Sequence, residues 1–275
     1  MGTLYLVATP IGNLGDISAR ALKILTEVSL IAAEDTRVTR KLLNHFYIST
    51  KVTSYFEHNK LSKLDAILAA LGTGDVALVS DAGTPGLNDP GFDLVREAIK
   101  TGHQVSPIPG ASAPVSALVA SGLPSDAFLY LGYLPRRSSE RLKFLDSIKH
   151  MPYTLIFLET PHRLLDSLQD INEKLGDRQV AVARELTKLH EQILRMSLTE
   201  ARNYFQVNQP RGEFTLVVAG NQVLEDSKWD EVRLFSAIQA GLNMDESTTR
   251  LAARLASESG WDRRKVYRLI TERRN

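Results

Sequence analysis

Carboxylate side chains occur in glycine- and proline-containing segments that follow short apolar runs. Asp16 lies in the segment ATPIGNLGD, and Asp81 and Asp89 lie in SDAGTPGLNDPG. Glycine allows the backbone to approach a ligand closely, and proline holds a loop in one conformation. Carboxylates in such loops can accept hydrogen bonds from hydroxyl or ammonium groups. The pattern predicts a pocket lined mainly by backbone, although ordinary turns use the same residue types.

The spacing of the glycines argues against a phosphate-binding loop. Gly83, Gly86 and Gly91 are three and then five residues apart, which does not match G-x-G-x-x-G, and the chain has no G-x-x-x-x-G-K-[ST] segment. The loops also carry acidic residues where a phosphate would need basic ones. A ligand with a ribose, a positive centre and no phosphate groups therefore fits better than NAD or ATP.

Short apolar runs alternate with helical patterns through most of the chain, which predicts an α/β fold with mixed, largely parallel sheets. Ligands in such folds bind beyond the carboxyl ends of the strands. Strands are expected at TLYLVAT, LIAAED, DVALVS, QVSPIPG, AFLYLGYLP, YTLIFLET, QVAVARE and EFTLVVAG. Helices are expected to begin with N-caps at Asp16, Asp89 and Thr160 and to end at Gly102 and Gly176.

These expected elements divide the chain into three parts. The pattern of the first half closes between Gly110 and Leu123, so we expect α/β domains at residues 1–115 and 116–225. Residues 226–275 have helical patterns only and form a tail. Its segment TTRLAARLASESGWDRRKVYRLI has the shape of a helix-turn-helix with Gly260 at the turn. Such a tail could contact nucleic acid or pack against a second subunit.

The composition excludes several classes of chemistry. The 275 residues are 43% hydrophobic and 24% charged, as in ordinary globular proteins. The chain has no cysteine and therefore no thiol nucleophile, and its six histidines lack metal-ligand spacing, so we expect no metal site. The N-terminus has no basic leader, and no segment approaches the ~20 apolar residues of a membrane span. We expect a cytoplasmic protein without a membrane partner.

The net charge of +1 conceals two basic runs. Residues 136–150 carry five basic and two acidic residues, a local charge of +3, and residues 262–275 carry six basic and two acidic residues, a local charge of +4. Each run could face a polyanion or form an ordinary solvated helix face. As RNA contacts, the candidates are Arg136, Arg137, Arg141, Lys143, Arg263, Arg264, Lys265 and Arg268.

Eight segments, in order from Leu4 to Gly220, carry a resemblance to a known family. They are LYLVATPIGNLGD, AAEDTR, VALVSDAGTPGLNDPG, PIPGASA, GLPSDAF, LIFLETPHRL, ARELTK and GEFTLVVAG. Together they resemble the S-adenosylmethionine-dependent tetrapyrrole methylase superfamily, and within it the branch of ribosomal RNA small-subunit 2'-O-ribose methyltransferases. The resemblance implies two α/β domains that enclose a trough, S-adenosylmethionine as the cofactor and a homodimer as the usual assembly.

The resemblance also assigns residues to the cofactor. Pro10 and Ile11 match the first cofactor loop, and Asp81, Gly83 and Thr84 match the central loop. Ser112 and Ala113 match the third loop, and Gly212 to Phe214 match a last backbone contact. Phe157 and Leu158 resemble the wall over the adenine. The sequence departs from the commonest form of the branch at Gly86, a position that often holds a bulkier apolar residue, and in PGAS, which some relatives replace by a cysteine-containing variant. Neither departure removes an expected polar contact.

Methyl transfer to a ribose needs an aligned acceptor oxygen and benefits from a base. Candidates lie in the segments EDTR and RELTK, and they are Glu34 or Glu185 as the base, with Arg37, Arg184 or Lys188 holding the adjacent phosphate. The alternative is that these charges pair with one another and only brace the trough. His162 in ETPHRL could also be a base, but a histidine at a helix start is more often structural.

Three classes of function follow from these patterns. The first is 2'-O-methylation of small-subunit ribosomal RNA, for which the resemblance implies a cytidine in the decoding region and the assembled subunit as substrate. The second is methylation of a corrin or porphyrin precursor, and the basic tail favours the first over it. The third is a nucleic-acid-binding regulator that works through the tail, which would leave the loops of the first half without a role. Basic residues do not specify the target nucleotide.

Overall fold

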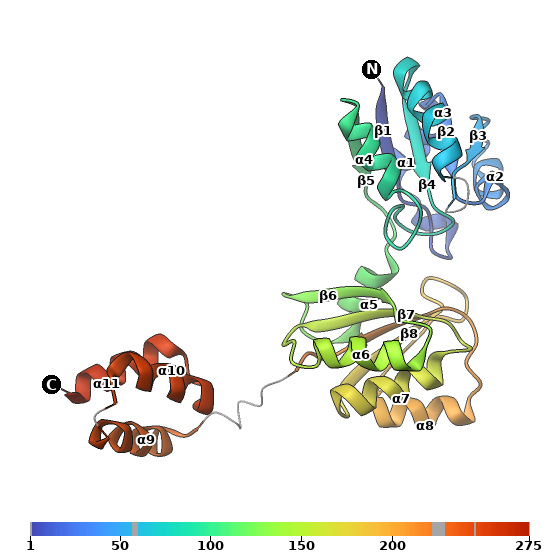
Figure 1. Ribbon diagram of the computed structural model, residues 1–275. Helices are drawn as coiled ribbons and strands as arrows, with labels where there is room; N and C mark the ends of the chain where they lie inside the picture. Colours follow the sequence, from blue (N-terminus) through green and yellow to red (C-terminus); the bar gives the residue numbers. More distant parts are fainter. Residues whose placement is uncertain (1, 57–59, 222–228, 245, 275) are drawn as a thin grey trace. The chain divides into compact units, whose positions relative to one another are not determined.

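The computed structural model describes residues 2–274 except 57–59, 222–228 and 245. Its contacts divide the chain into a larger unit, residues 1–148 and 153–219, and a smaller unit, residues 149–152 and 220–275. The larger unit contains two sheets and their helices, and the smaller unit is helical (Figure 1). Each unit is described by itself below.

The first sheet of the larger unit is parallel throughout its described strands. Its order is β3-β2-β4-β1-β5. The strands are β1 (Thr3–Val7), β2 (Leu30–Ala33), β3 (Val52–Ser54), β4 (Val76–Val79) and β5 (Gln104–Ile108). Helices α1 (Ala19–Glu27) and α2 (Thr36–His45) supply Leu25 and Leu43 to the core on one face. Helices α3 (Lys60–Thr73) and α4 (Phe92–Lys100) supply Leu71 and Leu94 on the other face. All carboxyl ends of this sheet therefore lie at one edge.

The second sheet is mixed. Its order is β6-β7-β10-β8-β9, from β6 (Phe128–Tyr133), β7 (Thr154–Glu159), β10 (Phe214–Val218), β8 (Gln179–Arg184) and β9 (Gln192–Ser197). Only β6 and β7 pair in parallel; the other described pairings are antiparallel. Helix α5 (Ala113–Ser121) covers one face, and α6 (Ser138–Ile148), α7 (Leu164–Leu175) and α8 (Leu198–Val207) cover the other (Figure 1). The expected α/β class is confirmed. Strands β3 and β9 were not expected, because neither VTS nor QILRMS has a continuous apolar run.

Three predicted helix starts are wrong, and two predicted helix ends are confirmed. Helices α1, α4 and α7 have Ser18, Gly91 and Arg163 as N-caps instead of Asp16, Asp89 and Thr160. Asp16 belongs to a separate 3-10 turn, Leu14–Asp16, whereas the side chain of Asp89 turns into a cavity described below. Gly102 and Gly176 follow α4 and α7, as expected. Capping patterns locate a helix end better here than its start.

The smaller unit is a bundle of α9 (Glu231–Asn243), α10 (Thr248–Ser259) and α11 (Arg263–Arg274). Leu234, Leu251 and Val266 come one from each helix into its core. Gly260 ends α10 in the left-handed conformation and turns the chain into α11, which confirms the helix-turn-helix shape. The predicted domain boundary at 225/226 lies outside the described residues, and that at 115/116 falls inside α5. None of the described helices has the length and apolar character needed to cross a membrane.

A buried ion pair joins α6 to α7 beneath the second sheet. The Arg141 Nη2 atom lies 2.6 Å from Asp170 Oδ2, and both side chains are at most one-tenth exposed. Asp170 also accepts a hydrogen bond from the Ser138 hydroxyl, at 3.0 Å. Arg141 donates further to the carbonyl oxygens of Pro135 and Arg136. Removing one partner of such a pair leaves the other as an uncompensated buried charge.

We predict that Asp170→Ala lowers the free energy of unfolding of the larger unit by about 3 kcal/mol, because Arg141 would keep its charge without a counter-charge. Urea unfolding followed by far-ultraviolet circular dichroism measures this effect. Asp166→Ala, at an exposed position of the same helix, is the matched control and should cost less than about 1 kcal/mol.

The tryptophans give an internal reference for this measurement. Trp229 and Trp261 are the only two in the chain, and both belong to the smaller unit. Tryptophan fluorescence should therefore report an unchanged transition in the Asp170→Ala variant. Equal losses of stability in the Asp170 and Asp166 variants would contradict the prediction.

Candidate functional site

A cavity of about 330 Å³ lies within the larger unit, at the carboxyl edge of the first sheet. From that sheet it is lined by the loops after β1, β2, β4 and β5, through residues such as Ile11, Glu34, Asp81 and Ser112. From the second sheet it is lined by β6, β7, β8 and β10, through residues such as Tyr130, Leu158, Ala183 and Thr215. Small-molecule pockets have volumes of roughly 300–1,000 Å³. The size and position are those of a ligand site in an α/β fold.

Backbone hydrogen bonds hold the first and central loops of this cavity together. Thr9 N donates to Gly83 O at 2.9 Å, and Gly83 N donates to Thr9 O at 3.0 Å. Gly83 has φ +81°, a left-handed conformation that glycine adopts without strain. The Thr84 hydroxyl donates to Ala111 O of the third loop at 3.4 Å. The three loops therefore form one connected wall of the cavity.

The central loop also reaches the second sheet. A Cβ atom at Gly132 of β6 would lie 2.4 Å from the Asn88 amide nitrogen, so only glycine permits this approach. The pairing of β6 with β7 shifts register between Tyr130 and Tyr133, and both tyrosines line the cavity. Regular alternation would send residues 130 and 133 to opposite faces. Burial raises the pKa of Tyr130 to about 12, so that its hydroxyl stays protonated at neutral pH.

Three carboxylates cluster on the side of the cavity formed by the first sheet. Glu34, Asp81 and Asp89 all line it, and Asp81 N donates to Glu34 Oε2 at 3.3 Å. Burial raises the pKa of Glu34 and of Asp81, and in each case a neighbouring carboxylate adds to the rise. Burial, together with the nearby charges of Glu34 and Asp81, raises the pKa of Asp89 to about 6. The cavity therefore favours a positively charged ligand, or a proton on one of these groups.

Most of the residues expected to bind a cofactor lie on this cavity. They are Ile11, Asp81, Gly83, Thr84, Ser112, Ala113, Leu158 and Phe214. Pro10 lines a second, smaller cavity instead. The Phe157 side chain is fully buried in the core on the opposite face of the second sheet. Gly212 lies beside Glu185, whose side chain would meet a Cβ atom at that position. The assignment of these residues to a cofactor stays a prediction.

The two candidate bases have different surroundings. Burial by itself would raise the pKa of Glu185, but the hydrogen bonds from Lys188 and from Glu213 N outweigh it and lower the pKa below the ordinary value. Lys188 Nζ lies 2.9 Å from Glu185 Oε1 and 3.0 Å from Glu213 Oε2. Glu34 has no such cationic partner among the causes that set its pKa. Glu185 and Lys188 therefore pair with each other, which is the arrangement expected if these charges only brace the trough.

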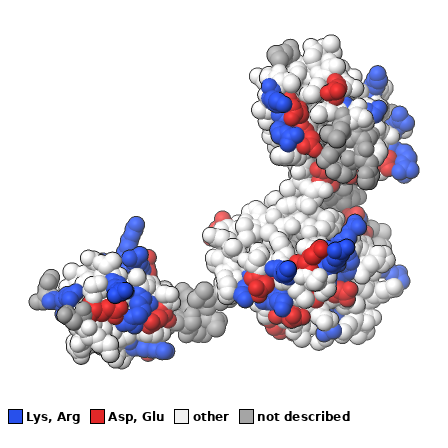
Figure 2. Space-filling view, viewed as in Figure 1, with Lys and Arg blue, Asp and Glu red and all other residues white. Residues whose placement is uncertain are grey.

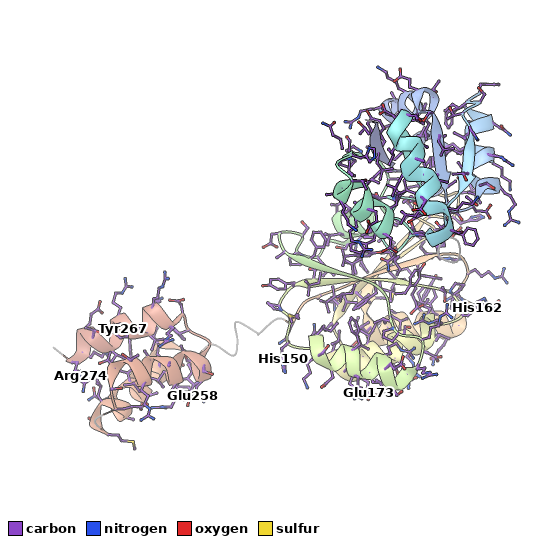
Figure 3. The ribbon with its side chains drawn as sticks, turned by 45° about the horizontal axis from the view of Figure 1, so that its top comes forward. His150, His162, Glu173, Glu258, Tyr267 and Arg274 are labelled. Carbon is purple, nitrogen blue, oxygen red and sulfur yellow. The ribbon has the colours of Figure 1, made fainter. Side chains whose placement is uncertain are left out.

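The candidate phosphate contacts differ in exposure. Arg37 is 85% exposed and pairs with Asp35 at 2.6 Å. Its hydrogen bonds lower the pKa of Asp35 to about 2. Arg184 donates from Nε to Arg211 O at 2.7 Å. His162 is exposed and is not among the residues that line the cavity (Figure 3).

Seven of the eight basic residues expected to contact RNA are exposed. Arg136, Arg137 and Lys143 are exposed at the start of α6, and Arg263, Arg264, Lys265 and Arg268 are exposed on α11. Arg141 is 4% exposed and held by Asp170, so it cannot reach a phosphate in this structure. Lys and Arg side chains appear on both helical surfaces, interspersed with acidic ones (Figure 2). Lys265 Nζ also lies 4.4 Å from the centroid of the Trp261 ring.

Tyr130 and Tyr133 line the cavity but were not among the site residues expected from the sequence. No sequence signal marks them, because the register shift that turns both to the cavity is a property of the pairing between β6 and β7. Asp89 was expected both as a carboxylate of the pocket loops and as a helix cap, and only the second role is wrong.

Comparison with known proteins identifies relatives along almost the whole chain. The family model described as Tetrapyrrole (Corrin/Porphyrin) Methylases matches residues 3–202. A protein of Halalkalibacterium halodurans named ribosomal RNA small subunit methyltransferase I is 45% identical over 272 residues, with 98% of this chain and 94% of the relative covered. The protein of the same name from Escherichia coli O157:H7 is 46% identical over 277 residues, with 98% and 95% covered.

A solved structure has the same fold at low sequence identity. Uroporphyrin-III C-methyl transferase from Thermus thermophilus, complexed with S-adenyl homocysteine, superposes with a TM-score of 0.54 at 19% identity. The superposition covers 80% of this chain and 98% of the other. At this identity the likeness concerns the fold alone.

The raised pKa of Asp89 predicts a pH-dependent stability. At a pH between the ordinary pKa of an aspartate and about 6, Asp89 keeps its proton in the folded chain but has lost it in the unfolded chain. The free energy of unfolding therefore falls as the pH rises through this range. Asp89→Asn removes the buried charge. We expect it to raise Tm by about 2–4 °C at pH 7.5, which corresponds to about 1 kcal/mol after allowance for partial exposure.

Thermal unfolding of both proteins at pH 4 and pH 7.5 checks this expectation. The difference between them should nearly vanish at pH 4, where Asp89 is protonated in the folded state. Asp65→Asn, at an exposed position of α3, is the control and should change Tm equally little at both pH values. A variant at Asp89 that is less stable than the parent at pH 7.5 would show that its charge is compensated.

Proposed function

This chain belongs to the tetrapyrrole (corrin/porphyrin) methylase family, in the branch of the ribosomal RNA small subunit methyltransferase I proteins, and we propose that it methylates small-subunit ribosomal RNA. The methyl donor is S-adenosylmethionine, and the acceptor is the ribose 2'-oxygen of a cytidine in the assembled small subunit. The observation that carries the proposal is the acidic cavity in a chain with relatives of this name along nearly its full length.

The residues of the cavity fit S-adenosylmethionine. Glu34, Asp81, Asp89, Glu159 and Glu213 line it, and no lysine or arginine does so among the described residues. Glu159 and Glu213 are paired with Arg163 and Lys188, so the excess of negative charge comes from the other three. Such an excess stabilises a sulfonium and an ammonium group, whereas a phosphate would be repelled. Ribose hydroxyls can donate to carboxylates, and Ile11, Leu158 and Phe214 offer apolar surface to an adenine. In this proposal the sulfonium and amino acid groups lie near Asp81, and the adenine near Leu158.

S-adenosylmethionine, when bound, supplies an electrophilic methyl group. The residues of the chain have to orient the acceptor hydroxyl and remove its proton. Glu34 suits the second task because it lines the cavity and because burial raises its pKa, which makes it a stronger base than an ordinary glutamate. Glu185 suits it less, because Lys188 and Glu213 N already occupy its carboxylate. We therefore assign the removal of the hydroxyl proton to Glu34, and we assign Glu185 a role in bracing the trough.

Exposed basic residues support an RNA substrate. Arg136 and Arg137 just before α6, Lys143 on α6, and Arg263, Arg264, Lys265 and Arg268 on α11 could contact phosphates. Arg37, which is mostly exposed and pairs with Asp35, could hold a phosphate near the acceptor ribose. Such contacts position RNA without reading its sequence. The homodimer and the cytoplasmic location implied by the family resemblance belong to the same proposal.

The transfer reaction itself tests the proposed function. We expect tritium from S-[methyl-³H]adenosylmethionine to enter the ribosomal RNA of small subunits purified from cells that lack this protein. Nuclease digestion should recover the label as a 2'-O-methylated cytidine. Free ribosomal RNA is the control for dependence on the assembled subunit. Label in a porphyrin or corrin precursor, with none in RNA, would overturn the proposal.

The assignment of the base is tested by Glu34→Gln. With saturating S-adenosylmethionine we expect the transfer rate to fall about 10²-fold, since a positioned base contributes roughly that factor or more. Glu185→Gln should lower the rate much less, and Glu27→Gln, at an exposed position of α1, should have no effect. The rate of the parent should also fall as the pH drops through the raised pKa of Glu34. Equal rates for the parent and Glu34→Gln would eliminate Glu34 as the base.

A further inference from the structure

A second cavity of about 210 Å³ adjoins the first. It is formed by the segment after β1, the first turns of α2 and the end of β4. Thr9 and Ser80, on its inner side, use their hydroxyls in hydrogen bonds within the loops. At roughly 30 Å³ per water molecule, the space exceeds what a few waters fill. It can accept a small organic group such as one nucleoside base.

The chemistry of this second cavity differs from that of the first. Lys41 contributes a positive charge, whereas no basic residue among those described lines the first cavity. Leu14 and Val38 supply apolar surface and are 41% and 40% exposed. Basic side chains also gather on the outer surface of α2 (Figure 2). An apolar surface beside a positive charge suits a planar base that carries a phosphate.

Thr39 shows that the cavity has an unused polar contact. The residue is 3% exposed, and its hydroxyl has no hydrogen-bond partner among the described residues. A buried hydroxyl without a partner costs about 1–3 kcal/mol, which a ligand that bonds to it would recover. Thr39 lies between Val38 and Lys41 on α2 and lines the same cavity. A group with hydrogen-bonding atoms on its edge would therefore bind there better than a purely apolar one.

Asp81 connects the two cavities. It lines both of them, and its carboxylate accepts a hydrogen bond from Asp35 N at 3.0 Å. In-line group transfer requires the reacting atoms to approach within about 3–3.5 Å. The acceptor must therefore occupy a space that adjoins the donor pocket. The second cavity meets this condition, and its lining adds the positive charge of Lys41 to the shared carboxylate of Asp81.

We propose that the second cavity receives the nucleoside of the RNA that is methylated. The base lies against Leu14 and Val38, the Thr39 hydroxyl bonds to its polar edge, and Lys41 contacts the attached phosphate. The ribose then lies beside Asp81, where its 2'-oxygen faces the first cavity. The inference rests on the proposed function and adds to it the site of the acceptor nucleotide. It also separates nucleotide binding at α2 from the general RNA contacts of α6 and α11.

Two variants on the same helix test the proposal. Lys41→Gln and Arg40→Gln each remove one exposed positive charge from α2, but only Lys41 lines the cavity. With unmethylated small subunits we expect Lys41→Gln to raise KM about tenfold, because a charge-assisted contact to a phosphate is lost. Arg40→Gln should change KM less than twofold. The affinity for S-adenosylmethionine, measured by calorimetry, should be unchanged in both.

A second pair of measurements examines the base contact. Thr39→Val keeps the shape of the side chain and removes the hydroxyl, so it should raise KM about fivefold. It should not lower the thermal stability of the protein, because the buried hydroxyl has no hydrogen bond to lose. Ultraviolet crosslinking of the wild-type protein to unmethylated small subunits, followed by mass spectrometry, should attach the target nucleotide to a peptide that contains residues 36–45. Crosslinks confined to α6 and α11 would count against the proposal.

The outcomes separate this inference from the proposed function. If the wild-type protein does not methylate RNA, the proposed function is wrong. If it does so while Lys41→Gln behaves as Arg40→Gln and Thr39→Val behaves as the parent, the nucleotide binds elsewhere and the present inference is overturned. A loss of S-adenosylmethionine affinity in Lys41→Gln would also overturn it, because the second cavity would then belong to the donor.

Discussion

The reciprocal backbone hydrogen bonds between Thr9 and Gly83 are the constraint on which the site depends. They connect the loop after β1 to the loop after β4, so neither loop can move without the other. Ser80 and Asp81 precede the connection, and Ile11 follows it on the other loop. The position of the Asp81 carboxylate, and the boundary between the two cavities, are therefore set by backbone geometry. Parallel strands make this possible because their carboxyl ends all meet at one edge.

Charge is distributed unevenly around that edge. Carboxylates line the first cavity, and their partial burial raises the pKa of Glu34, Asp81 and Asp89. Exposed basic residues of the same unit lie outside it, on α2 and at α6. In the proposed function, a cationic methyl donor and a polyanionic acceptor would each be attracted to a different region of this unit. They would then not compete for the same charged groups.

The fold could be predicted from the sequence to the extent that local signals determine it. Apolar runs identified the strands of both sheets except β3 and β9, and glycines marked the ends of α4 and α7. The helix starts failed because capping residues are common in loops, where Asp89 takes part in the cavity instead. The candidate site was predictable where it consists of loop residues, such as Asp81 and Ser112. It was not predictable at Tyr130 and Tyr133, where a register shift decides which face each side chain occupies.

The two basic runs illustrate the division between what residue order determines and what requires the folded chain. Residue order is sufficient for the α/β class, the helical tail and the family, because these follow from periodicity and from eight segments in register. It could not distinguish Arg141 from Arg137, since both lie in the same run. Arg141 is buried against Asp170 of α7, whereas Arg137 is exposed and pairs with Glu140. Nor could it separate Glu34 from Glu185, whose roles depend on Lys188 and Glu213 beside one of them. The contacts of Arg141 with Asp170 and of Glu185 with Glu213 join residues 29 and 28 positions apart, so only tertiary structure determines burial, pairing and the pKa that follows from them.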